Sequence, residues 1–445
     1  MYGKWNASRL LDAGRALMGG SRWWAWLAAT AAVGTTAAYL TAAAAPAAAT
    51  RSPAKPSAAD RPLSCGPPTF FIPCYTPKQF EVAYGVQPLL SRGINGSGQT
   101  VMMPEELNAP GPDFTDIRQD LAAFDSRFGL PPARLRVLTT LAPTKHPYVA
   151  GTEEVEDTEI VHAIAPDATL DVVLAPSNTS ASPANFAAAL TNVMRVGIAQ
   201  QASVISISAS GGEHFLTRAA VIGMNAVLEQ ARARHVTVVA SSGDGGAISD
   251  LGPPRQVSLP ASDPLVLAVG GTSLNADSRT GAYDGEIAWN ELTGASGGGF
   301  SRLFPRPSYQ DGIPGIAATR GVPDVAANAD SRTAMAMDFT GNVFESAHGT
   351  SAATPLWAAV IALADQEAGH HLGFVNAAIY QIARSPAYHR AFHDVITGNN
   401  SVMVPKGGGI VVGDQAAPGW DPVTGWGSPD AQVLVPLLAR NAATN

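Results

Sequence analysis

The sequence predicts an α/β fold in which a parallel β-sheet is covered by helices on both faces. From residue 75 onward, short β-rich runs alternate with longer stretches of helical composition. This alternation is typical of parallel sheets, because each crossover between parallel strands needs a long connection. One run, Val204–Ser208, is β-rich and continuous, as expected for a strand buried on both faces.

The expected elements follow in chain order. The strands are Gln99–Met103, Thr169–Leu174, Val204–Ser208, Val236–Ala240 and Leu265–Val269. The helices are Asp116–Arg127, residues 151–167 with an end at Pro166, Ala184–Val196 and Arg218–Ala233. Ligands of parallel sheets bind beyond the carboxyl ends of the strands. We therefore expect a functional site in the loops after Ser208 and Ala240.

The first 50 residues have the composition of an export leader. An uncharged stretch, Trp23–Thr50, ends in several small-residue cleavage sites at Ala42–Ala49. The basic residues before it are Lys4, Arg9, Arg15 and Arg22. This pattern is typical of a long signal peptide or a weakly apolar membrane anchor, and we favour cleavage. Since a positive flank stays inside, the rest is expected to be secreted or on the extracellular face, with membrane contact only through this segment.

The only two cysteines, Cys65 and Cys74, come just after a Pro-, Ala- and Ser-rich linker at residues 51–64. In an exported protein a close pair is expected to form a disulfide, which for so short a loop stabilises by roughly 2–3 kcal/mol. The alternative, a two-cysteine metal site, lacks nearby histidines or further cysteines. The expected organisation is a leader at 1–50, a linker and disulfide loop at 51–74, and one globular domain at 75–445.

Composition excludes several classes of function. Apolar residues make up 46% and charged residues 14% of the 445 residues, which suits a large core. The net charge of −8 and a pI near 5.6 argue against a nucleic-acid partner. No His-Glu-x-x-His motif is present, so a zinc peptidase is not expected. We expect a monomer.

Ser351 is predicted to open a helix that is apolar nearly all round. The run Leu356–Ala364 follows it, and Pro355 is expected in the first turn, where its missing N–H costs nothing. Gly349 and Thr350 allow a sharp turn and leave room for a ligand. A serine at the positive end of a helix dipole suits a nucleophile whose oxyanion is held by nearby donors. An ordinary N-cap serine on a core helix has the same pattern.

Asp244 is the only charged residue in the glycine-rich loop that follows Ala240, Ser-Ser-Gly-Asp-Gly-Gly. Glycines around one carboxyl allow the backbone to approach a ligand closely. On this loop alone, a solvated turn aspartate is the more usual explanation of the pattern.

The helix at 151–167 carries a carboxylate pair. At the helical period, Glu153 and Asp157 fall on one line with apolar residues at 160, 161 and 164, whereas Glu154 and Glu159 point elsewhere. Two carboxylates on a buried face are unfavourable unless they share a proton. A shared proton is typical of acid–base chemistry in the acid range. The alternative is an acidic helix on the surface.

These motifs together resemble the sedolisins, or serine-carboxyl peptidases, which are similar to subtilisins but have a Glu–Asp pair in place of His. The matching phrases are Gly-Thr-Ser-x-x-x-Pro at Gly349–Pro355, Glu-x-x-x-Asp-x-Glu at Glu153–Glu159, Ser-Gly-Asp at Ser242–Asp244, and longer phrases at Tyr75–Tyr84, Gly297–Arg302 and Arg320–Ala326. The resemblance implies a subtilisin-like fold in a single catalytic domain. It also implies a serine-type endopeptidase or tripeptidyl-peptidase that hydrolyses peptides or proteins at acidic pH.

The resemblance assigns a role to each matching residue. Ser351 would be the nucleophile and Glu153 its general base. Asp157 would orient Glu153 through a hydrogen bond. Asp244 would complete the oxyanion hole as a protonated acid, together with the Ser351 backbone N–H.

The resemblance also implies one structural calcium ion near the C-terminus. Its ligands would be the carboxylates of Asp394 and Asp421 and the carbonyls of Val395, Ala417 and Gly419. Ligation by oxygen alone fits a hard cation such as Ca²⁺. Without the resemblance, Asp421 would be interpreted as a turn residue.

Three features depart from the family pattern. Sedolisins are usually made with a large prosegment; none is expected here, so the chain would fold unaided, use a prosegment from another chain, or be restrained in another way. His348 stands where glycine is usual. Ala209 stands where a tryptophan usually forms a network with a glutamate, matched by Glu105. A catalytically silent binding module is therefore the main alternative. A conventional subtilisin with His348 or His162 as base is a third, although His348 lies only three residues before Ser351.

Overall fold

A computed structural model of the chain describes most of the sequence after residue 62. The described residues are 63–65, 73–106, 115–139, 149–175, 182–249, 252–292, 294–339, 342–344, 348–404 and 408–441. The predicted leader (1–50) and most of the predicted linker and disulfide loop (51–74) lie outside these ranges. No helix among the described residues is both long and apolar enough to cross a membrane.

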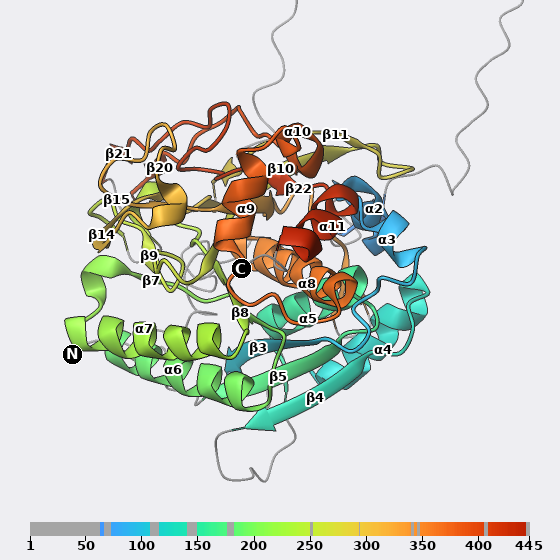
Figure 1. Cartoon of the computed structure of the whole chain (residues 1–445). Helices are drawn as coiled ribbons and strands as arrows, with labels where there is room; N and C mark the ends of the chain where they lie inside the picture. The colour runs from blue at the N-terminus through green and yellow to red at the C-terminus, as the bar shows by residue number, and fades with distance from the viewer. Residues whose placement is uncertain are drawn as a thin grey trace, which may run out of the picture. The chain divides into compact units, whose positions relative to one another are not determined.

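An eight-stranded, mainly parallel sheet forms the centre of the fold, as the sequence predicts (Figure 1). Its strands lie in the order β11-β10-β8-β6-β3-β5-β4, and β16 also pairs with β10. Only the β10–β11 pairing is antiparallel. The bounds are β3 (Thr100–Glu106), β4 (Arg134–Thr139), β5 (Thr169–Ala175), β6 (Val204–Ile207), β8 (Thr237–Ser241), β10 (Leu267–Ala276), β11 (Tyr283–Ala288) and β16 (Val325–Asn328).

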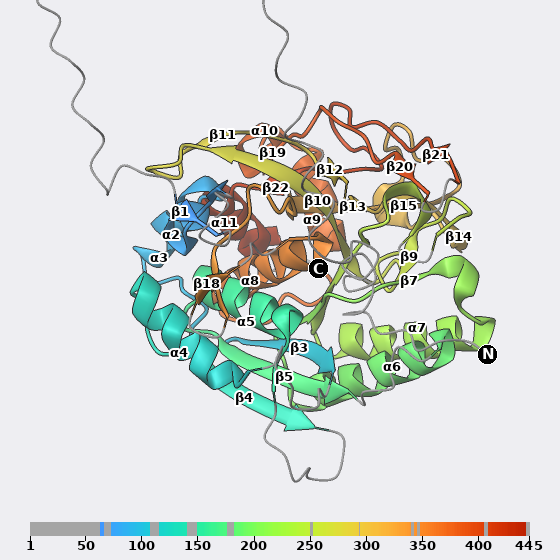
Figure 2. The ribbon, with the colours of Figure 1, turned by 180° about the vertical axis from the view of Figure 1, so that it is seen from behind.

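Helices cover both faces of this sheet, each with its own apolar core. Val101 and Met103 of β3 pack with the core that holds α5 and α8, whereas Met102 between them packs with α6 and α7. In Figures 1 and 2, α8 lies near the centre of the molecule, and α6 and α7 run side by side. The longer helices are α2 (Pro77–Ala83), α4 (Ile117–Phe128), α5 (Thr152–Ile164), α6 (Pro183–Ala199), α7 (Arg218–Ala233), α8 (Thr350–Ala368), α9 (Asn376–Ala383) and α11 (Ala431–Asn441).

Short elements complete the connections and form small sheets. The helices are α3 (Gln87–Leu90) and α10 (Tyr388–Ala391), and the strands are β1 (Leu63–Ser64), β2 (Pro73–Cys74), β7 (Gly211–Gly212), β9 (Ser258–Leu259), β12 (Asn290–Glu291), β13 (Gly294–Ala295), β14 (Gly299–Pro305), β15 (Thr319–Val322), β17 (Met337–Phe339), β18 (Asn342–Phe344), β19 (Phe392–His393), β20 (Val402–Met403), β21 (Ile410–Val411) and β22 (Ser428–Pro429).

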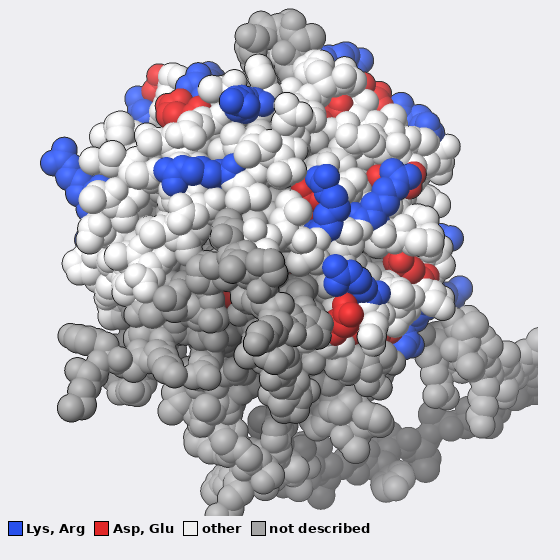
Figure 3. Space-filling view, turned by 90° about the horizontal axis from the view of Figure 1, so that it is seen from below, with Lys and Arg blue, Asp and Glu red and all other residues white. Residues whose placement is uncertain are grey.

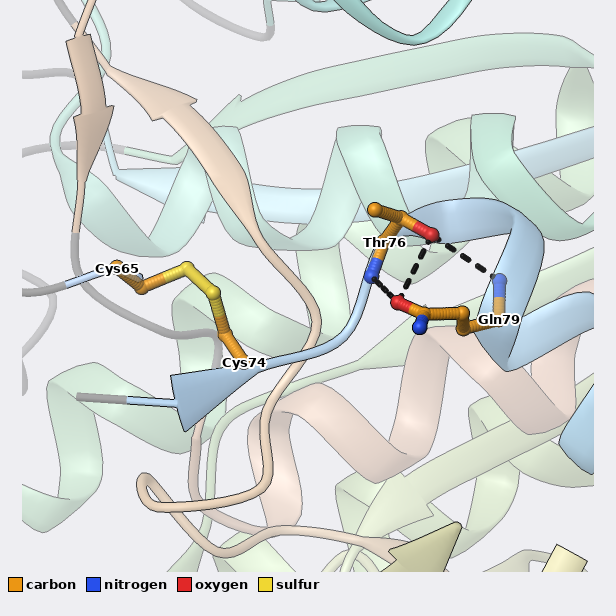
Figure 4. The surroundings of a disulfide bond; sticks show 4 residues. All are labelled: Cys65, Cys74, Thr76 and Gln79. Carbon is orange, nitrogen blue, oxygen red and sulfur yellow. Dashed lines mark hydrogen bonds between the residues drawn. A yellow bond between two sulfur atoms is a disulfide. The ribbon is translucent and has the colours of Figure 1, made fainter. Parts of the chain in front are cut away.

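The start of the described chain is fixed by the predicted disulfide, which the structure confirms. Cys65 and Cys74 are bonded to each other, and both are buried (Figure 4). Just after Cys74, Thr76 caps α2: its hydroxyl accepts the N–H of Gln79, and the Gln79 side chain accepts the N–H of Thr76. This capping box satisfies donors that a helix start leaves unpaired. The disulfide and the capping box thus hold together the segment that precedes the sheet.

Candidate active site

Ser351 lies in the first turn of α8, where helix and sheet meet. The helix begins at Thr350, and its N-cap, Gly349, has a φ of 87°. A Cβ at residue 349 would lie 2.6 Å from an Asp244 carboxylate oxygen, so only glycine fits the turn. Ser351 itself is half-buried, whereas Leu356–Ala364 is fully buried. The prediction of a serine that opens a core helix is therefore confirmed.

Pro355 lies inside α8 rather than in its first turn, which corrects the sequence prediction. Because proline has no N–H, the carbonyl of Ser351 lacks the usual bond from four residues later. The Ser208 hydroxyl, just after β6, donates to this carbonyl at 3.2 Å and to the Asp157 carboxylate at 2.8 Å. The Ser351 hydroxyl in turn lies 3.3 Å from the Ser208 carbonyl oxygen. The proline thus frees a carbonyl that links the serine to the end of the central strand.

Helix α5 is buried almost all round, which corrects the prediction that Glu154 and Glu159 point away from the core. Glu154 is 5% exposed, Glu156 3% and Glu159 0%. Helices α2, α4 and α8 and strand β17 pack around α5. Each of the three carboxyls accepts one backbone N–H, those of Gly151 at 2.7 Å, His348 at 3.3 Å and Asp338 at 2.9 Å respectively. These bonds offset part of the cost of burying three acids.

Glu153 is the carboxyl of α5 that contacts the serine. Its side chain is half-buried and is hydrogen-bonded to the Ser351 side chain. Removal from water raises the pKa of Glu153 well above its usual range, and the charge of Asp157 raises it further, whereas the bond with Ser351 acts in the opposite direction. A carboxyl with a raised proton affinity, next to a hydroxyl, can accept the proton of that hydroxyl.

Asp157 lies one turn further along α5 and is fully buried. Burial raises its pKa to about 7, although hydrogen bonds from Ser208 and Glu105 hold it down. Glu105, at the end of β3, is 6% exposed, and burial together with the Asp157 charge raises its pKa well above the usual range. One oxygen of each carboxyl receives no N–H or hydroxyl donor among the described residues. A proton held by Glu105 and shared with Asp157 satisfies both. Glu105 therefore reaches Asp157 directly although Ala209 takes the place of the expected tryptophan.

Asp244 follows β8 and lies against the start of α8. Its Oδ1 accepts both the backbone N–H and the hydroxyl of Thr350, each at 2.7 Å, and the Thr350 hydroxyl accepts the N–H of Gly243 at 3.1 Å. Its Oδ2 points toward Gly349. The two loops at the ends of β6 and β8 thus meet at Ser351, as the strand-end argument predicts. The solvated-turn interpretation of Asp244 is wrong, because the carboxyl is fixed at a helix start.

The two histidines considered as a base in the subtilisin alternative bond to groups other than the serine. His162 is fully buried, and its Nε2 lies 2.9 Å from both the Asp125 carboxylate and the carbonyl of Pro131. His348 offers its backbone N–H to Glu156. Glu153, by contrast, is a candidate base whose side chain is hydrogen-bonded to Ser351.

The residues predicted to bind calcium lie in two neighbouring loops. The Asp394 carboxylate accepts the N–H of Gly419 at 3.1 and 3.2 Å. The Thr424 hydroxyl lies 3.0 Å from the Asp421 carboxylate and 3.3 Å from the Val395 carbonyl, so these two oxygens converge. Burial raises the pKa of Asp421 to about 6. Among the described residues, no three His, Cys, Asp or Glu side chains are grouped to hold a metal ion. Two carboxylates with carbonyl oxygens nevertheless fit the oxygen ligation that Ca²⁺ prefers.

Three residues make contacts in the site that the sequence did not predict. Ser208 links Asp157 to Ser351, Thr350 holds Asp244, and Glu156 contacts the peptide before Gly349. A signal for Ser208 was present, since it ends a strand whose following loop was expected to carry the site. Pro355, four residues after Ser351, also indicates an unpaired carbonyl that needs a donor.

On the face shown in Figure 3, the lysines and arginines of the described residues are interspersed with acidic residues, and the coloured part shows no continuous patch of one sign.

The chain is similar in sequence to a known protein family and to characterised relatives. Residues 148–427 match the subtilase family. Kumamolisin of Bacillus sp. (strain MN-32) is 34% identical over 383 residues, which cover 83% of this chain and 64% of the relative. Tripeptidyl-peptidase 1 of Homo sapiens is 32% identical over 262 residues, 53% of this chain and 43% of the relative. The chain therefore spans less than two thirds of the length of these curated relatives.

One solved structure is similar to this chain over almost the whole length of that structure. It is described as Pseudomonas sedolisin (serine-carboxyl proteinase) complexed with two molecules of pseudo-iodotyrostatin. The TM-score is 0.66 at 27% sequence identity, over 83% of this chain and 97% of that structure.

Proposed function

Because the chain belongs to the sedolisin, or serine-carboxyl peptidase, group of the subtilase family, we propose that it hydrolyses peptide bonds in peptides or proteins at acidic pH. One observation carries the proposal: the Ser351 hydroxyl is hydrogen-bonded to a carboxyl, Glu153, at the start of a buried helix. Asp157 and Asp244 lie around the same serine. Both endopeptidase and tripeptidyl-peptidase action fit this site.

The reaction follows the chemistry of a serine nucleophile. Ser351 Oγ attacks the carbonyl carbon of the substrate while Glu153 accepts the hydroxyl proton. The Ser351 backbone N–H and a proton on Asp244 stabilise the oxyanion. Glu153 then passes its proton to the leaving amine, and the C–N bond breaks to give an acyl-enzyme. Water, deprotonated by Glu153, attacks the ester and releases the acid, and the proton returns to Ser351.

The position of the proton on Asp244 follows from its hydrogen bonds. Oδ1 already accepts two hydrogens from Thr350, so a proton donated to an oxyanion must lie on Oδ2. An ionised carboxylate there would repel the developing negative charge. Catalysis should therefore require the protonated form of Asp244.

Asp157 would act as the orienting acid through its position one turn from Glu153 on α5. Ser208 fixes one of its oxygens, and Glu105 shares a proton with it. This support argues against the silent-relative alternative that the substitution by Ala209 suggested. Glu105, rather than an aromatic side chain, would keep Asp157 in place.

Export and calcium binding belong to the same proposal. The basic and then apolar composition of residues 1–50 supports export, and a disulfide fits an oxidising compartment. Asp394, Asp421 and the carbonyls of Val395, Ala417 and Gly419 would hold one Ca²⁺ ion. That ion would fix the C-terminal loops, and no step of catalysis passes through it.

A serine-directed peptidyl phosphonate tests the proposed function most directly. We expect it to label the wild type at Ser351 in acidic buffer and to label S351A not at all. S351A removes one oxygen and should fold normally, but hydrolysis should fall by several powers of ten. Normal turnover by a folded S351A would disprove the mechanism. An unlabelled, inactive wild type would instead support a silent binding module.

A further inference from the structure

Glu156 is a buried acid beside the proposed active site to which the mechanism above gives no role. It lies three residues after Glu153 and one before Asp157, and it is 3% exposed. Its Oε2 accepts the backbone N–H of His348 at 3.3 Å. Its Oε1 is buried and has no hydrogen-bond partner among the described residues. Burial of a carboxyl with a single hydrogen bond lowers the stability of the folded protein.

The bond from Glu156 belongs to a series of three that fix the turn into α8. The successive N–H groups of residues 348, 349 and 350 bond to Glu156 on α5, the Ala329 carbonyl after β16, and Asp244 after β8. Each partner comes from a different part of the fold. The next N–H along the chain is that of Ser351, the proposed oxyanion donor. Its direction therefore depends on all three bonds.

The groups that face Glu156 are acidic. From its own helix these are Glu153 and Asp157, and from the loop after β8 it is Asp244. The loop it contacts also carries the titratable side chain of His348. Burial, and then the charges of Glu153 and Asp157, raise the pKa of Glu156 well above its usual range, against the single bond from His348. Glu156 therefore keeps its proton in the acidic range in which the peptidase is proposed to work.

We propose that Glu156 is a positioning residue that, in its neutral form, holds the His348 peptide and so directs the Ser351 N–H toward the oxyanion. The inference rests on the proposed peptidase function. Loss of the Glu156 proton adds a negative charge next to Glu153 and the developing oxyanion. The added charge repels the developing oxyanion, so Glu156 contributes to the loss of activity toward neutral pH.

Two substitutions at this residue separate its two roles. E156Q keeps an acceptor for the His348 N–H but cannot ionise. We expect wild-type kcat at acidic pH and an alkaline limb of the pH–kcat profile moved to higher pH. E156L removes the acceptor, so kcat should fall at every pH by about tenfold or more, with KM little changed, because the nucleophile turn is displaced. A purely structural role would not move the pH profile.

Glu159 provides a matched control on the same helix. It too is buried and accepts one backbone N–H, and its second oxygen has no hydrogen-bond partner among the described residues, but it faces Asp338 of β17 rather than the turn into α8. E159Q should keep the wild-type pH profile. If E156Q and E159Q both superimpose on an active wild type, the inference is wrong and the peptidase proposal stands. If E156L does not fold, the E156Q profile decides. An inactive wild type overturns both proposals.

Discussion

Glu81 provides a quantitative test of the idea that buried acids adapt this fold to acidic conditions. It lies on α2, away from Ser351, and is 9% exposed. Burial raises its pKa from an ordinary value of 4.5 to about 7, against the opposing charge of Lys78 one turn earlier. E81Q replaces the acid by a neutral side chain of almost the same shape, which cannot lose a proton.

The sign and size of the effect follow from linkage between protonation and folding. The folded state binds the Glu81 proton more tightly than the unfolded state, so the stabilisation is complete below pH 4.5 and is lost as pH rises through about 7. A tenfold change in proton affinity corresponds to about 1.4 kcal/mol, which gives roughly 3 kcal/mol for this group. Water near the exposed part of the side chain screens the effect, so we expect roughly 2–3 kcal/mol.

Urea unfolding of the disulfide-intact protein at about pH 4 and about pH 8 measures this difference. The wild type should lose more unfolding free energy between the two pH values than E81Q, by roughly 2–3 kcal/mol. E229Q removes an acid whose side chain is 55% exposed and controls for the loss of a charge. An E81Q curve parallel to the wild type would refute the assigned proton affinity of Glu81.

Three further outcomes are expected. D244N can place its amide NH₂ at the Oδ2 position and still accept hydrogen bonds from Thr350 through its carbonyl, so activity should persist to higher pH. D244A should lose about 10²–10³ in kcat, and a near-normal kcat in D244A would contradict the oxyanion role. T350V leaves the buried N–H of Gly243 without its acceptor, so the free energy of unfolding, measured in urea, should fall by about 1–3 kcal/mol. Unchanged stability would show that another acceptor replaces the Thr350 hydroxyl. Added Ca²⁺ should raise the melting temperature of the wild type but not of D394N or D421N; a wild type indifferent to both chelator and Ca²⁺ would exclude the site.

The central strands and covering helices could be predicted because their signals are local. The helix Arg218–Ala233 has the predicted bounds, and the strand predicted at Val204–Ser208 is one residue shorter in the structure. Strands β4, β11 and β16 were not predicted. Arg134–Thr139 is a half-exposed edge strand with charged residues, and Val325–Asn328 pairs with a strand more than 50 residues earlier. Such pairings depend on distant segments and leave little trace in the local pattern.

The carboxylate pair could be predicted from one apolar line on a helix, but the full acidic cluster could not. Helical periodicity assumes that the face opposite the apolar line is in water. Around α5 this assumption fails, because elements from four separate parts of the chain enclose it. Glu154, Glu156 and Glu159 are therefore buried although the sequence places them off the apolar line. Their burial follows from tertiary packing.

Glu153 can act as a base only while the carboxyls around it, those of Glu105, Glu156 and Asp157, are neutral. This requirement connects the acidic cluster to the proposed acidic pH range. Burial raises the pKa of Glu105, Glu153 and Glu156, and the charge of Asp157 raises all three further. Such a cluster can hold few negative charges at once. Glu153 is less buried than these companions and is the one bonded to Ser351, so it is the group best placed to exchange a proton. As pH rises, the companions begin to ionise, and both the stability of the site and the developing oxyanion are penalised. The same burial that creates the base therefore limits the pH at which it works.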